Sequence, residues 1–391
     1  MIKLAVFATH PIQYLTPWLQ LLAQQQGIDL TVYYGHLPDA YQQGKDFDIS
    51  LKWDIPLLDG YKWRVLSNCI YNCGHKTIFR KMLAISRNLY RVKTDVAIIT
   101  GWQELILWQA IFFCMWKNIP QIIRCESNAM RKRAWFIRYA HRLLLHRFRA
   151  FLAIGRANQA FYLQYGVPER SIFPCYYCVD NQRFLSQFQE IIKRRDQIRS
   201  EFYIPPERFC FLFVGKLTPK KRLMDLLGAL KLAIKKDVAV HLLVVGTGRL
   251  MKPARTFVEK YQLPVTFAGF LNQNEIVRAY VAGDCLVLPS DFGETWGLVV
   301  NEAMVCGLPA IVSNRVGCGP DLIEEGVTGF VFPFSDINTL AEKMLITAFS
   351  KRYREMGVNA RKRIMEQYSV KKAVWGTLEA LKKCNPKSSI I

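Results

Sequence analysis

Short apolar runs, each followed by a longer stretch with helical periodicity, recur along the chain of 391 residues. In the first half the runs are Lys3–Ala8, Leu30–Tyr34, Asp95–Ile99, Gln121–Arg124 and Ala150–Ile154. In the second half they are Cys210–Val214, Val240–Val245, Val265–Ala268, Cys285–Leu288, Ala310–Val312 and Phe330–Phe332. Nearly continuous apolar runs that alternate with helices indicate parallel strands buried on both faces. Two such series predict an α/β protein with two doubly wound domains.

A polar stretch of helical character separates the two series and predicts the domain boundary. It reads "RFLSQFQEIIKRRDQIRSEFYIPPERF" and is followed by a fresh strand. We predict an N-terminal Rossmann-like domain at 1–182, a linker at 183–207, a C-terminal Rossmann-like domain at 208–366, and a helix at 367–391 that crosses back to the first domain. Open parallel sheets bind ligands beyond the carboxyl ends of their strands, so the two domains are expected to face each other across a cleft.

The chain is strongly basic, with 53 Lys+Arg against 31 Asp+Glu and a formal charge of +22. Such an excess indicates an anionic partner or simply a basic surface. No acidic residue occurs between Glu126 and Glu169, and the stretch 131–149 interleaves arginines with aromatic residues. This pattern predicts a basic amphipathic helix. Such a helix can lie on an anionic membrane surface, pack its apolar stripe on the N-terminal sheet with its arginines in water, or do both.

Membrane-spanning and metal-binding classes have weak support in the sequence. The longest apolar segment, "LILWQAIFFCMW", is too short to cross a bilayer and is interpreted as a buried helix. The chain enters its first strand without a signal-peptide pattern, which predicts a cytoplasmic protein. Its 11 cysteines are then expected to be reduced. The possible ligand groups, Cys69, Cys73 and His75 or Cys175 and Cys178, lack the spacing of a zinc site, so no metal is expected.

Candidate chemistry in the second half centres on "SDFGETWGLVVNEAM", where Glu294 and Glu302 bracket a predicted helix start. The first N–H groups of that helix, at Gly297, Leu298 and Val299, have no partners within the helix and suit a phosphate. Glu302 lies about 7.5 Å further along the axis, roughly the offset from a pyrophosphate to a ribose. Two carboxylates around an anion site are typical acceptors for sugar hydroxyls. A nucleotide sugar carries hydroxyls at both ends of its phosphates.

The loop after Cys210–Val214 supplies the complementary cations. In "FLFVGKLTPKKR", Gly215 allows a tight turn, and Lys216 and Lys221 follow it with charges suited to a polyphosphate. The Gly246–Gly248 turn after Val240–Val245 resembles a dinucleotide-binding turn but lacks the third glycine. The turn is either a simple connection from strand to helix or a site of direct phosphate contact.

These motifs together resemble the family 4 retaining glycosyltransferases of GT-B fold. The resemblance rests on "FVGKLTPKKR", "LLVVGTGRL", "VTFAGFL", "PSDFGETWGLVVNEAMVCGLPAIVSNRVG" and "EGVTGFVFP" in the second half. The first half matches more loosely, through "THPIQYLTPW" and "AFLAIGRANQAFYLQYGV".

The resemblance implies a role for each candidate residue. Glu302 should hold the donor ribose and Glu294 the donor sugar, and the backbone at Gly297, Leu298 and Val299 should meet the diphosphate. The base should be received at Gly269, Phe270 and Leu271, after Val265–Ala268. Gly215 shapes the turn before Lys216 and Lys221, which stand where the family usually has an Arg and a Lys on the diphosphate. Arg222 replaces a common glycine.

The first half departs from the family pattern at two positions. The usual glycine-rich turn after the first strand is replaced by "ATHPIQYLTP", with His10, and the usual histidine after the fourth strand by "PQIIRCESN", with Glu126. Either residue could line the acceptor side, and a structural role for His10 stays open.

The implied reaction is the transfer of a glycosyl group with retention of configuration, from a nucleotide-diphosphate sugar (UDP rather than GDP) to a saccharide or lipid-linked acceptor. The lysines and the helix start can stabilise the leaving diphosphate without a metal or other cofactor. The expected location is the inner face of the plasma membrane, with peripheral attachment through 131–149. Two alternatives stay open: another GT-B enzyme, such as a nucleotide-sugar epimerase, and a basic nucleic-acid-binding protein. The second has no nucleic-acid-binding module in the sequence, and no nucleic-acid partner is expected.

Overall fold

A computed structural model describes residues 1–66, 84–131, 133–236, 238–350 and 352–385. The chain divides into two compact units. The first contains residues 1–39, 56–177 and 370–391, and the second contains residues 40–55 and 178–369. This division differs from the predicted boundaries. Residues 40–55 and 178–182 group with the second unit rather than the first, the predicted linker at 183–207 is part of the second unit, and that unit ends at residue 369 rather than 366.

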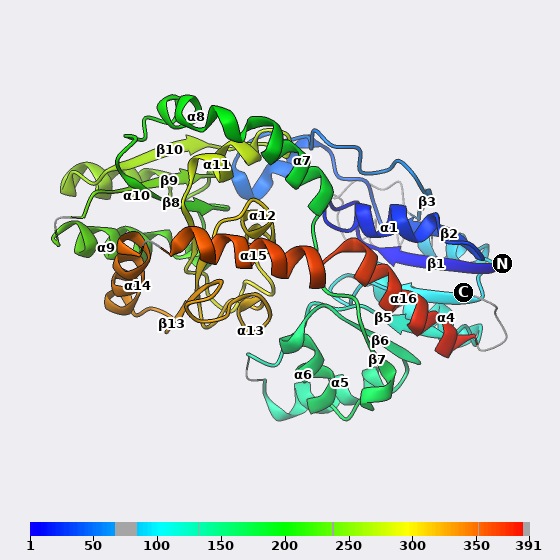
Figure 1. Cartoon of the computed structure of the whole chain (residues 1–391). Helices are drawn as coiled ribbons and strands as arrows, with labels where there is room; N and C mark the ends of the chain where they lie inside the picture. The colour runs from blue at the N-terminus through cyan, green and yellow to red at the C-terminus, as the bar shows by residue number, and fades with distance from the viewer. Residues whose placement is uncertain (67–83, 132, 237, 351, 386–391) are drawn as a thin grey trace. The chain divides into compact units, whose positions relative to one another are not determined.

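The first unit is built on a parallel sheet with the strand order β3-β2-β1-β4-β5-β6-β7 (Figure 1). Its strands are β1 (Ile2–Ala8), β2 (Ile28–Tyr34), β3 (Lys62–Val65), β4 (Val96–Ile99), β5 (Gln121–Ile123), β6 (Ala150–Ala153) and β7 (Ile172–Pro174). The central strands are almost wholly buried, because helices cover both faces. The order reverses direction between β1 and β4, which is the switch point of a doubly wound sheet.

Helices from both ends of the chain cover this sheet. They are α1 (Thr16–Ala23), α4 (Leu105–Trp116), α5 (Trp135–Leu145), α6 (Arg156–Gln164), the short 3₁₀ helix η2 (Glu169–Ser171) and α16 (Val370–Cys384). The C-terminal helix α16 packs beside α1, where Trp18 Nε1 donates to Thr377 Oγ1 at 3.1 Å. It also lies against β7 at Gly376, where a Cβ atom would meet the Pro174 carbonyl oxygen at 1.7 Å. Glycine is therefore required at this crossing.

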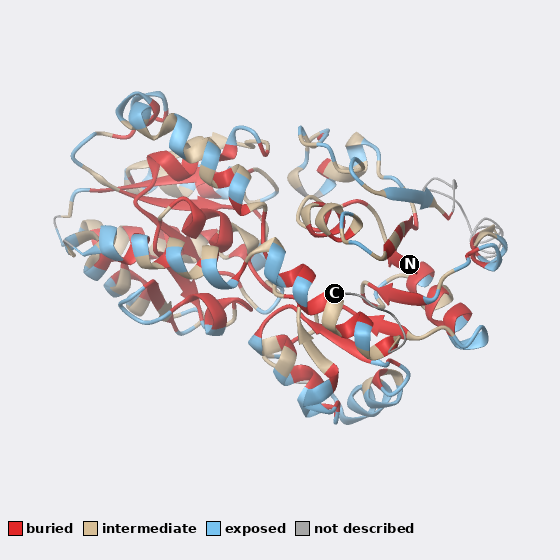
Figure 2. Cartoon of the chain, turned by 45° about the vertical axis from the view of Figure 1, so that its right-hand side comes forward, coloured by how far each residue is buried: buried red, intermediate tan, exposed pale blue. Residues whose placement is uncertain are grey.

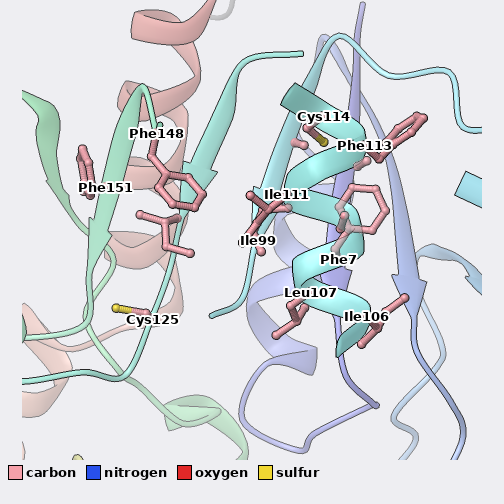
Figure 3. Packing of buried hydrophobic residues seen from close by; sticks show 14 of the residues in the cluster. Phe7, Ile99, Ile106, Leu107, Ile111, Phe113, Cys114, Cys125, Phe148 and Phe151 are labelled. Carbon is pink, nitrogen blue, oxygen red and sulfur yellow. The ribbon is translucent and has the colours of Figure 1, made fainter. Parts of the chain in front are cut away.

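Helix α4 differs from the buried helix interpreted from its sequence. Ile106, Leu107 and Ile111 pack on Phe7 and Ile99 of the sheet, as Figure 3 shows. The opposite face exposes apolar side chains, of which the largest are Phe112 and Trp116. A sequence with a single polar residue, Gln109, carries almost no periodicity, so it did not reveal which face would be exposed.

The second unit has a parallel sheet with the order β10-β9-β8-β11-β12-β13. Its strands are β8 (Phe209–Val214), β9 (Val240–Val245), β10 (Val265–Gly269), β11 (Cys285–Leu288), β12 (Ala310–Ser313) and β13 (Gly329–Phe332). Figure 2 shows the buried strands of this sheet between helices whose outer faces are exposed. The predicted class, α/β with two parallel Rossmann-like sheets, is confirmed.

The helices of the second unit follow the strands in alternation. The α-helices are α2 (Ala40–Gly44), α7 (Asn181–Ile191), α8 (Arg195–Glu201), α9 (Leu223–Ile234), α10 (Met251–Tyr261), α11 (Ile276–Ala282), α12 (Leu298–Val305), α13 (Gly319–Leu322), α14 (Ile337–Phe349) and α15 (Tyr353–Gln367). The 3₁₀ helices are η1 (Lys45–Phe47), η3 (Ile192–Arg194) and η4 (Pro219–Lys221).

The stretch predicted as a linker is a packed part of this unit. Helices α7 and α8 lie against α11. Arg195 Nη2 contacts Asp284 Oδ1 at 2.7 Å, and Arg199 Nη1 contacts Asp284 Oδ2 at 3.2 Å. The Asp284 carboxylate also accepts from the Cys210 N–H at the start of β8. Two arginines around one buried carboxylate fix α8 to the sheet, because separating them would leave a buried charge unpaired.

Candidate functional site

The carboxyl ends of three strands in the second unit form one interlocked set of glycine turns. Gly215 follows β8, Gly246 follows β9 and Gly269 ends β10. The Gly215 N–H donates to the Val245 carbonyl at 3.0 Å, and the Gly246 N–H donates to the Gly269 carbonyl at 2.7 Å. A Cβ atom on Gly246 would lie 2.0 Å from the Gly215 carbonyl oxygen, so the backbones meet directly. The Gly246 turn thus packs directly against its neighbours.

Helix α12 begins beside these turns, at Gly297. Gly297 has φ of +103°, and a Cβ atom there would lie 2.8 Å from Leu288 Cδ2. Only glycine adopts this conformation in this space without strain. The loop after β12 braces the same region, because the Gly317 N–H donates to the Glu294 carbonyl at 3.1 Å. The N-terminal amides of α12, from Leu298 and Val299, are therefore presented by a rigid turn.

Glu302 lies in the second turn of α12 and is buried. The Tyr280 hydroxyl of α11 donates a hydrogen bond to its Oε2 atom. Burial raises the pKa of the Glu302 carboxyl to about 7, although the Tyr280 bond and the charge of Arg183 act in the opposite direction. Arg183 of α7 is itself fixed by Gln273, with contacts of 2.8 Å to its carbonyl and 2.6 Å to its Oε1 atom. The carboxylate retains lone pairs for hydroxyl donors beyond Tyr280.

Lys221 and Glu294 form an ion pair at the start of the same site. Lys221 is buried in η4, and its side chain lies against Gly215. The loops that carry the two residues are joined by the Asp291 N–H, which donates to the Lys220 carbonyl at 2.8 Å. A lysine and a glutamate predicted to contact the same donor molecule thus contact each other. Their pairing satisfies two nearly buried charges.

The backbone conformation of the next residue, Arg222, is one that favours glycine, the residue common at this position in the family that the motif resembles. Its φ is +55°, in the left-handed region. Its guanidinium is held by Asp225 at 2.7 Å and by Ser335 Oγ at 2.9 Å. These contacts help to stabilise a conformation that a residue with a Cβ atom adopts rarely.

The turn after β10, predicted to receive a base, contacts residues from far earlier in the chain. Gly269 has φ of +73°, and Leu271 is half-buried beyond it. The Phe270 ring lies 4.9 Å from the Phe47 ring, centroid to centroid. Lys216 Nζ lies 5.2 Å from the centroid of the same Phe47 ring. Phe47 thus contacts both a predicted diphosphate residue and the predicted base loop.

In the first unit, Glu126 follows β5 in a cluster of aromatic and basic side chains. The Tyr177 hydroxyl donates to Glu126 Oε1. Burial, and then the charge of Glu126, raise the pKa of the neighbouring Tyr14 hydroxyl. The Arg124 guanidinium lies over the rings of Tyr177 at 4.5 Å and Trp18 at 5.4 Å. This cluster holds an acidic group at the carboxyl end of the sheet.

His10 follows β1 at the carboxyl end of the same sheet. Thr9 Oγ1 lies 2.9 Å from the Nδ1 atom of His10. The centroids of the His10 and His36 rings are 5.4 Å apart. Burial lowers the pKa of His10, so its neutral form is favoured. A neutral imidazole next to a hydroxyl can accept or donate a proton.

Metal ligands do not cluster in the part of the chain that the structure describes. Cys175 and Cys178 are buried free thiols. Cys69, Cys73 and His75 lie outside the described residues. A search of the described helices also finds none with the length and apolar character needed to cross a bilayer.

The architecture defines the fold class of the protein. Its fold matches GT-B glycosyltransferase structures over nearly the full chain. Anabaena HepE in complex with UDP and glucose has a TM-score of 0.72 at 17% identity and covers 98% of this chain and 100% of its own. WaaG, a glycosyltransferase involved in lipopolysaccharide biosynthesis, has a TM-score of 0.64 at 15% identity. The match covers 95% of this chain and 98% of WaaG. The fold is therefore GT-B.

The family model of the glycosyl transferases group 1 matches residues 194–363, which contain the α12 site. The sulfoquinovosyl transferase SQD2 of Arabidopsis thaliana is 32% identical over 195 residues, 49% of this chain and 36% of the relative. The N-acetyl-alpha-D-glucosaminyl L-malate synthase of Bacillus anthracis is 28% identical over 191 residues, 48% and 49% of the two chains. The chain thus spans half or less of the length of these curated relatives. Residues 194–363 are therefore similar to the glycosyl transferases group 1.

Proposed function

We propose that the chain is a glycosyltransferase. It would move a sugar from a nucleotide-diphosphate sugar to a saccharide or lipid-linked acceptor in the biosynthesis of cell-envelope polysaccharide or glycolipid. The observation that carries this proposal is the buried Glu302 carboxylate in the second turn of a helix whose glycine start is flanked by the Lys221–Glu294 pair. The group 1 family match and the UDP and glucose in the related HepE structure support it. UDP is the proposed nucleotide.

The proposed chemistry breaks the bond between the anomeric carbon and the diphosphate and forms a bond from that carbon to an acceptor hydroxyl. Negative charge develops on the leaving diphosphate, where Lys216, Lys221 and the first amides of α12 would stabilise it. Retention of configuration requires the acceptor to enter from the face that the diphosphate leaves. A departing phosphate oxygen on that face can take the hydroxyl proton. The charges of the two lysines make a divalent metal unnecessary in this proposal.

On the acceptor side we propose His10 and Glu126. Both lie at the carboxyl end of the first sheet, where open parallel sheets bind their ligands. Glu126 is held by Tyr177, and His10 by Thr9, so each side chain has a defined orientation. A carboxylate and a neutral imidazole can both accept hydrogen bonds from an acceptor sugar.

A thermal-shift screen of UDP- and GDP-sugars, followed by NMR of the products, tests the function. We expect at least one donor to raise the Tm, and that donor to yield a transferred sugar with unchanged anomeric configuration. Turnover should persist in EDTA. His10→Ala and Glu126→Gln should lower transfer while keeping the donor-induced shift. Epimerised donor without transfer would instead favour the alternative GT-B enzyme, and no shift with any donor would contradict a nucleotide-sugar site.

We further propose that the enzyme attaches peripherally to an anionic membrane, on the inner face of the plasma membrane, through 131–149. Within this stretch, residue 132 lies outside the described residues, and α5 spans Trp135–Leu145. Leu145 packs into the core, but Trp135 is 79% exposed, and Phe136 and Tyr139 are also exposed. The alternative in which the whole apolar stripe packs on the sheet therefore does not account for these aromatic side chains.

The chemistry of the exposed face of α5 matches an anionic bilayer surface. Arg138 and Arg142 lie on the helix beside the exposed aromatics, and Arg147 and Arg149 follow it, all of them exposed. Each basic residue near an anionic bilayer contributes about 1 kcal/mol to binding. Tryptophan and tyrosine favour the boundary between headgroups and acyl chains. A lipid-linked acceptor would be reached from such a position.

Sedimentation with liposomes tests this attachment. The wild type should sediment with vesicles containing anionic lipid at low salt, and less at high salt, because screening weakens the arginine contribution. The double variant Trp135→Ala/Phe136→Ala should lose most of this binding and keep its fold. Phe349→Ala, which removes an equally exposed aromatic from α14, is the matched control and should bind as wild type does. Equal sedimentation of the double variant and the wild type would contradict a role for α5.

A further inference from the structure

Residues 40–55 belong to the first half of the sequence but fold as part of the second unit. They contain α2, η1 and a left-handed residue, Asp48, with φ of +59°. The Leu51 N–H donates to the Ala40 carbonyl at 2.8 Å and closes the loop. At Gly44 a Cβ atom would lie 1.8 Å from the Ile49 carbonyl oxygen. The segment thus has a defined conformation rather than that of an open linker.

Hydrogen bonds fix this segment to the loop after β10. Asn272 Nδ2 donates to the Lys52 carbonyl at 2.8 Å. Asn274 binds Asp54 twice, with its backbone N–H 3.1 Å from Oδ2 and its Nδ2 3.0 Å from the carbonyl. The segment is therefore attached to the same loop that carries Phe270.

The attachment places two aromatic rings of the segment on Phe270. Phe47 meets it edge to face, with an interplanar angle of 70°, and the Trp53 ring lies 6.3 Å from it. The centroid of the Phe47 ring also lies 5.2 Å from Lys216 Nζ. Phe47 therefore contacts both the cation after β8 and the aromatic residue after β10.

A cavity of about 530 Å³ borders the segment at Asp48, the neighbour of Phe47 in the chain. Its other wall is the turn after β9 and the start of α10, including Thr247, Arg249 and Lys252. This volume falls within the range of small-molecule sites. Planar rings beside Lys216, one residue along the chain from this cavity, fit a flat heteroaromatic group that carries phosphates.

We propose that Phe47 and Trp53 are base-contacting residues of the nucleotide site, supplied by the first half of the chain to complete the predicted base site at Phe270. The inference rests on the proposed function and extends its donor site to residues 40–55. The ligand class is a nucleoside diphosphate, whose base stacks on these rings while its diphosphate meets Lys216. Because stacking accepts any base, the segment sets affinity, and the choice between UDP and GDP is left to the hydrogen bonds of the loop.

Calorimetric titration with UDP, GDP and inorganic pyrophosphate tests the proposal. Phe47→Ala should weaken binding of the better nucleotide about 10-fold or more, the loss expected for one aromatic–base contact. Phe47→Tyr should restore it. Pyrophosphate, which has no base, should bind Phe47→Ala and wild type equally, and Phe349→Ala should match wild type in every titration. Circular dichroism melts show whether each variant is folded.

The outcomes separate this inference from the proposed function. If wild type binds neither nucleotide, the proposed function itself fails, and the inference falls with it. If wild type binds a nucleotide but Phe47→Ala binds it equally well, the segment is not part of the base pocket. Tighter binding by Phe47→Ala would likewise overturn the proposal, because Phe47 would then occlude the pocket. Equal losses for nucleotide and pyrophosphate would assign the effect to Lys216 rather than to the base.

Discussion

Replacing Glu302 with alanine should weaken donor binding about 100-fold or more. In the proposed complex the carboxylate accepts two ribose hydroxyls, and each hydrogen bond to a charged group contributes about 1.5–3 kcal/mol. The effect should appear as a loss of nucleotide affinity in calorimetry and as a loss of the donor-induced Tm shift. Pyrophosphate binding should change much less, because pyrophosphate lacks the ribose.

A second variant separates this binding role from stability. Glu302→Ala also removes the acceptor of the buried Tyr280 hydroxyl, which costs stability whether or not Glu302 binds a donor. Glu302→Gln keeps an acceptor of the same length for Tyr280 but loses the charge. If Glu302→Gln binds the donor as tightly as wild type, the carboxylate is not the ribose ligand.

The raised pKa of Glu302 gives the same experiment a pH dependence. Hydroxyl donors favour the ionised carboxylate, so donor affinity of the wild type should rise as the pH passes through about 7. Stability changes in the opposite direction. The folded protein holds this proton more tightly than the unfolded chain, whose carboxyl has its ordinary pKa of 4.5, so the free energy of unfolding falls between about pH 4.5 and 7. Glu302→Gln should lack both dependences.

The central strands were predictable because burial on both faces requires continuous apolar residues. Each apolar run of the sequence coincides with or overlaps a strand of the structure. The strands that the pattern missed, β3 and β7, lie at the two edges of the first sheet. β3 reads "KWRV" and is mostly exposed, and β7 ends in a proline. An edge strand is paired on one side only, so it tolerates charge and proline, and its sequence resembles that of a loop.

The packing of 183–207 was hidden for a different reason. Its polar helices suggested a linker, yet Arg195 and Arg199 turn their charges inward onto Asp284. A buried ion pair between residues more than 80 positions apart leaves no local periodicity to detect. The 40–55 segment shows the same limit, since its contact with Phe270 depends on tertiary structure alone.

Within the candidate site, local motifs indicated the residues that share one loop or helix. Glu294, Gly297 and Glu302 are close in sequence, and the structure arranges them around the start of α12. Sequence reasoning missed the residues that surround Glu302, namely Tyr280 and Arg183. Tyr280 lies in an apolar helix, where an aromatic residue is expected to belong to the hydrophobic core. Arg183 lies in the stretch that was predicted to be a linker. Their roles emerge only from the buried hydrogen bonds.

Replacing Lys221 with methionine should lower kcat about 10²- to 10³-fold, the loss typical of removing one group that stabilises developing negative charge. Methionine keeps most of the side-chain volume against Gly215 and removes only the charge. Steady-state kinetics of sugar transfer give the measurement. Lys220→Met is the matched control, because the neighbouring Lys220 is exposed and should leave kcat near the wild-type value.

Because Lys221 pairs with Glu294, a fall in kcat of Lys221→Met could also come from a disturbed fold. A double variant separates the two explanations. Lys221→Met leaves the Glu294 carboxylate nearly buried and unpaired, so the single variant should also be destabilised. Lys221→Met/Glu294→Gln removes that unpaired charge and should recover the Tm. Turnover should stay low in the double variant, because the cation for the leaving diphosphate is still missing and the proposed sugar contact of Glu294 is altered. If the double variant recovers both the Tm and the turnover, Lys221 stabilises the fold through Glu294 and does not stabilise the diphosphate. Lys216 and the first amides of α12 would then be the remaining groups that could stabilise it.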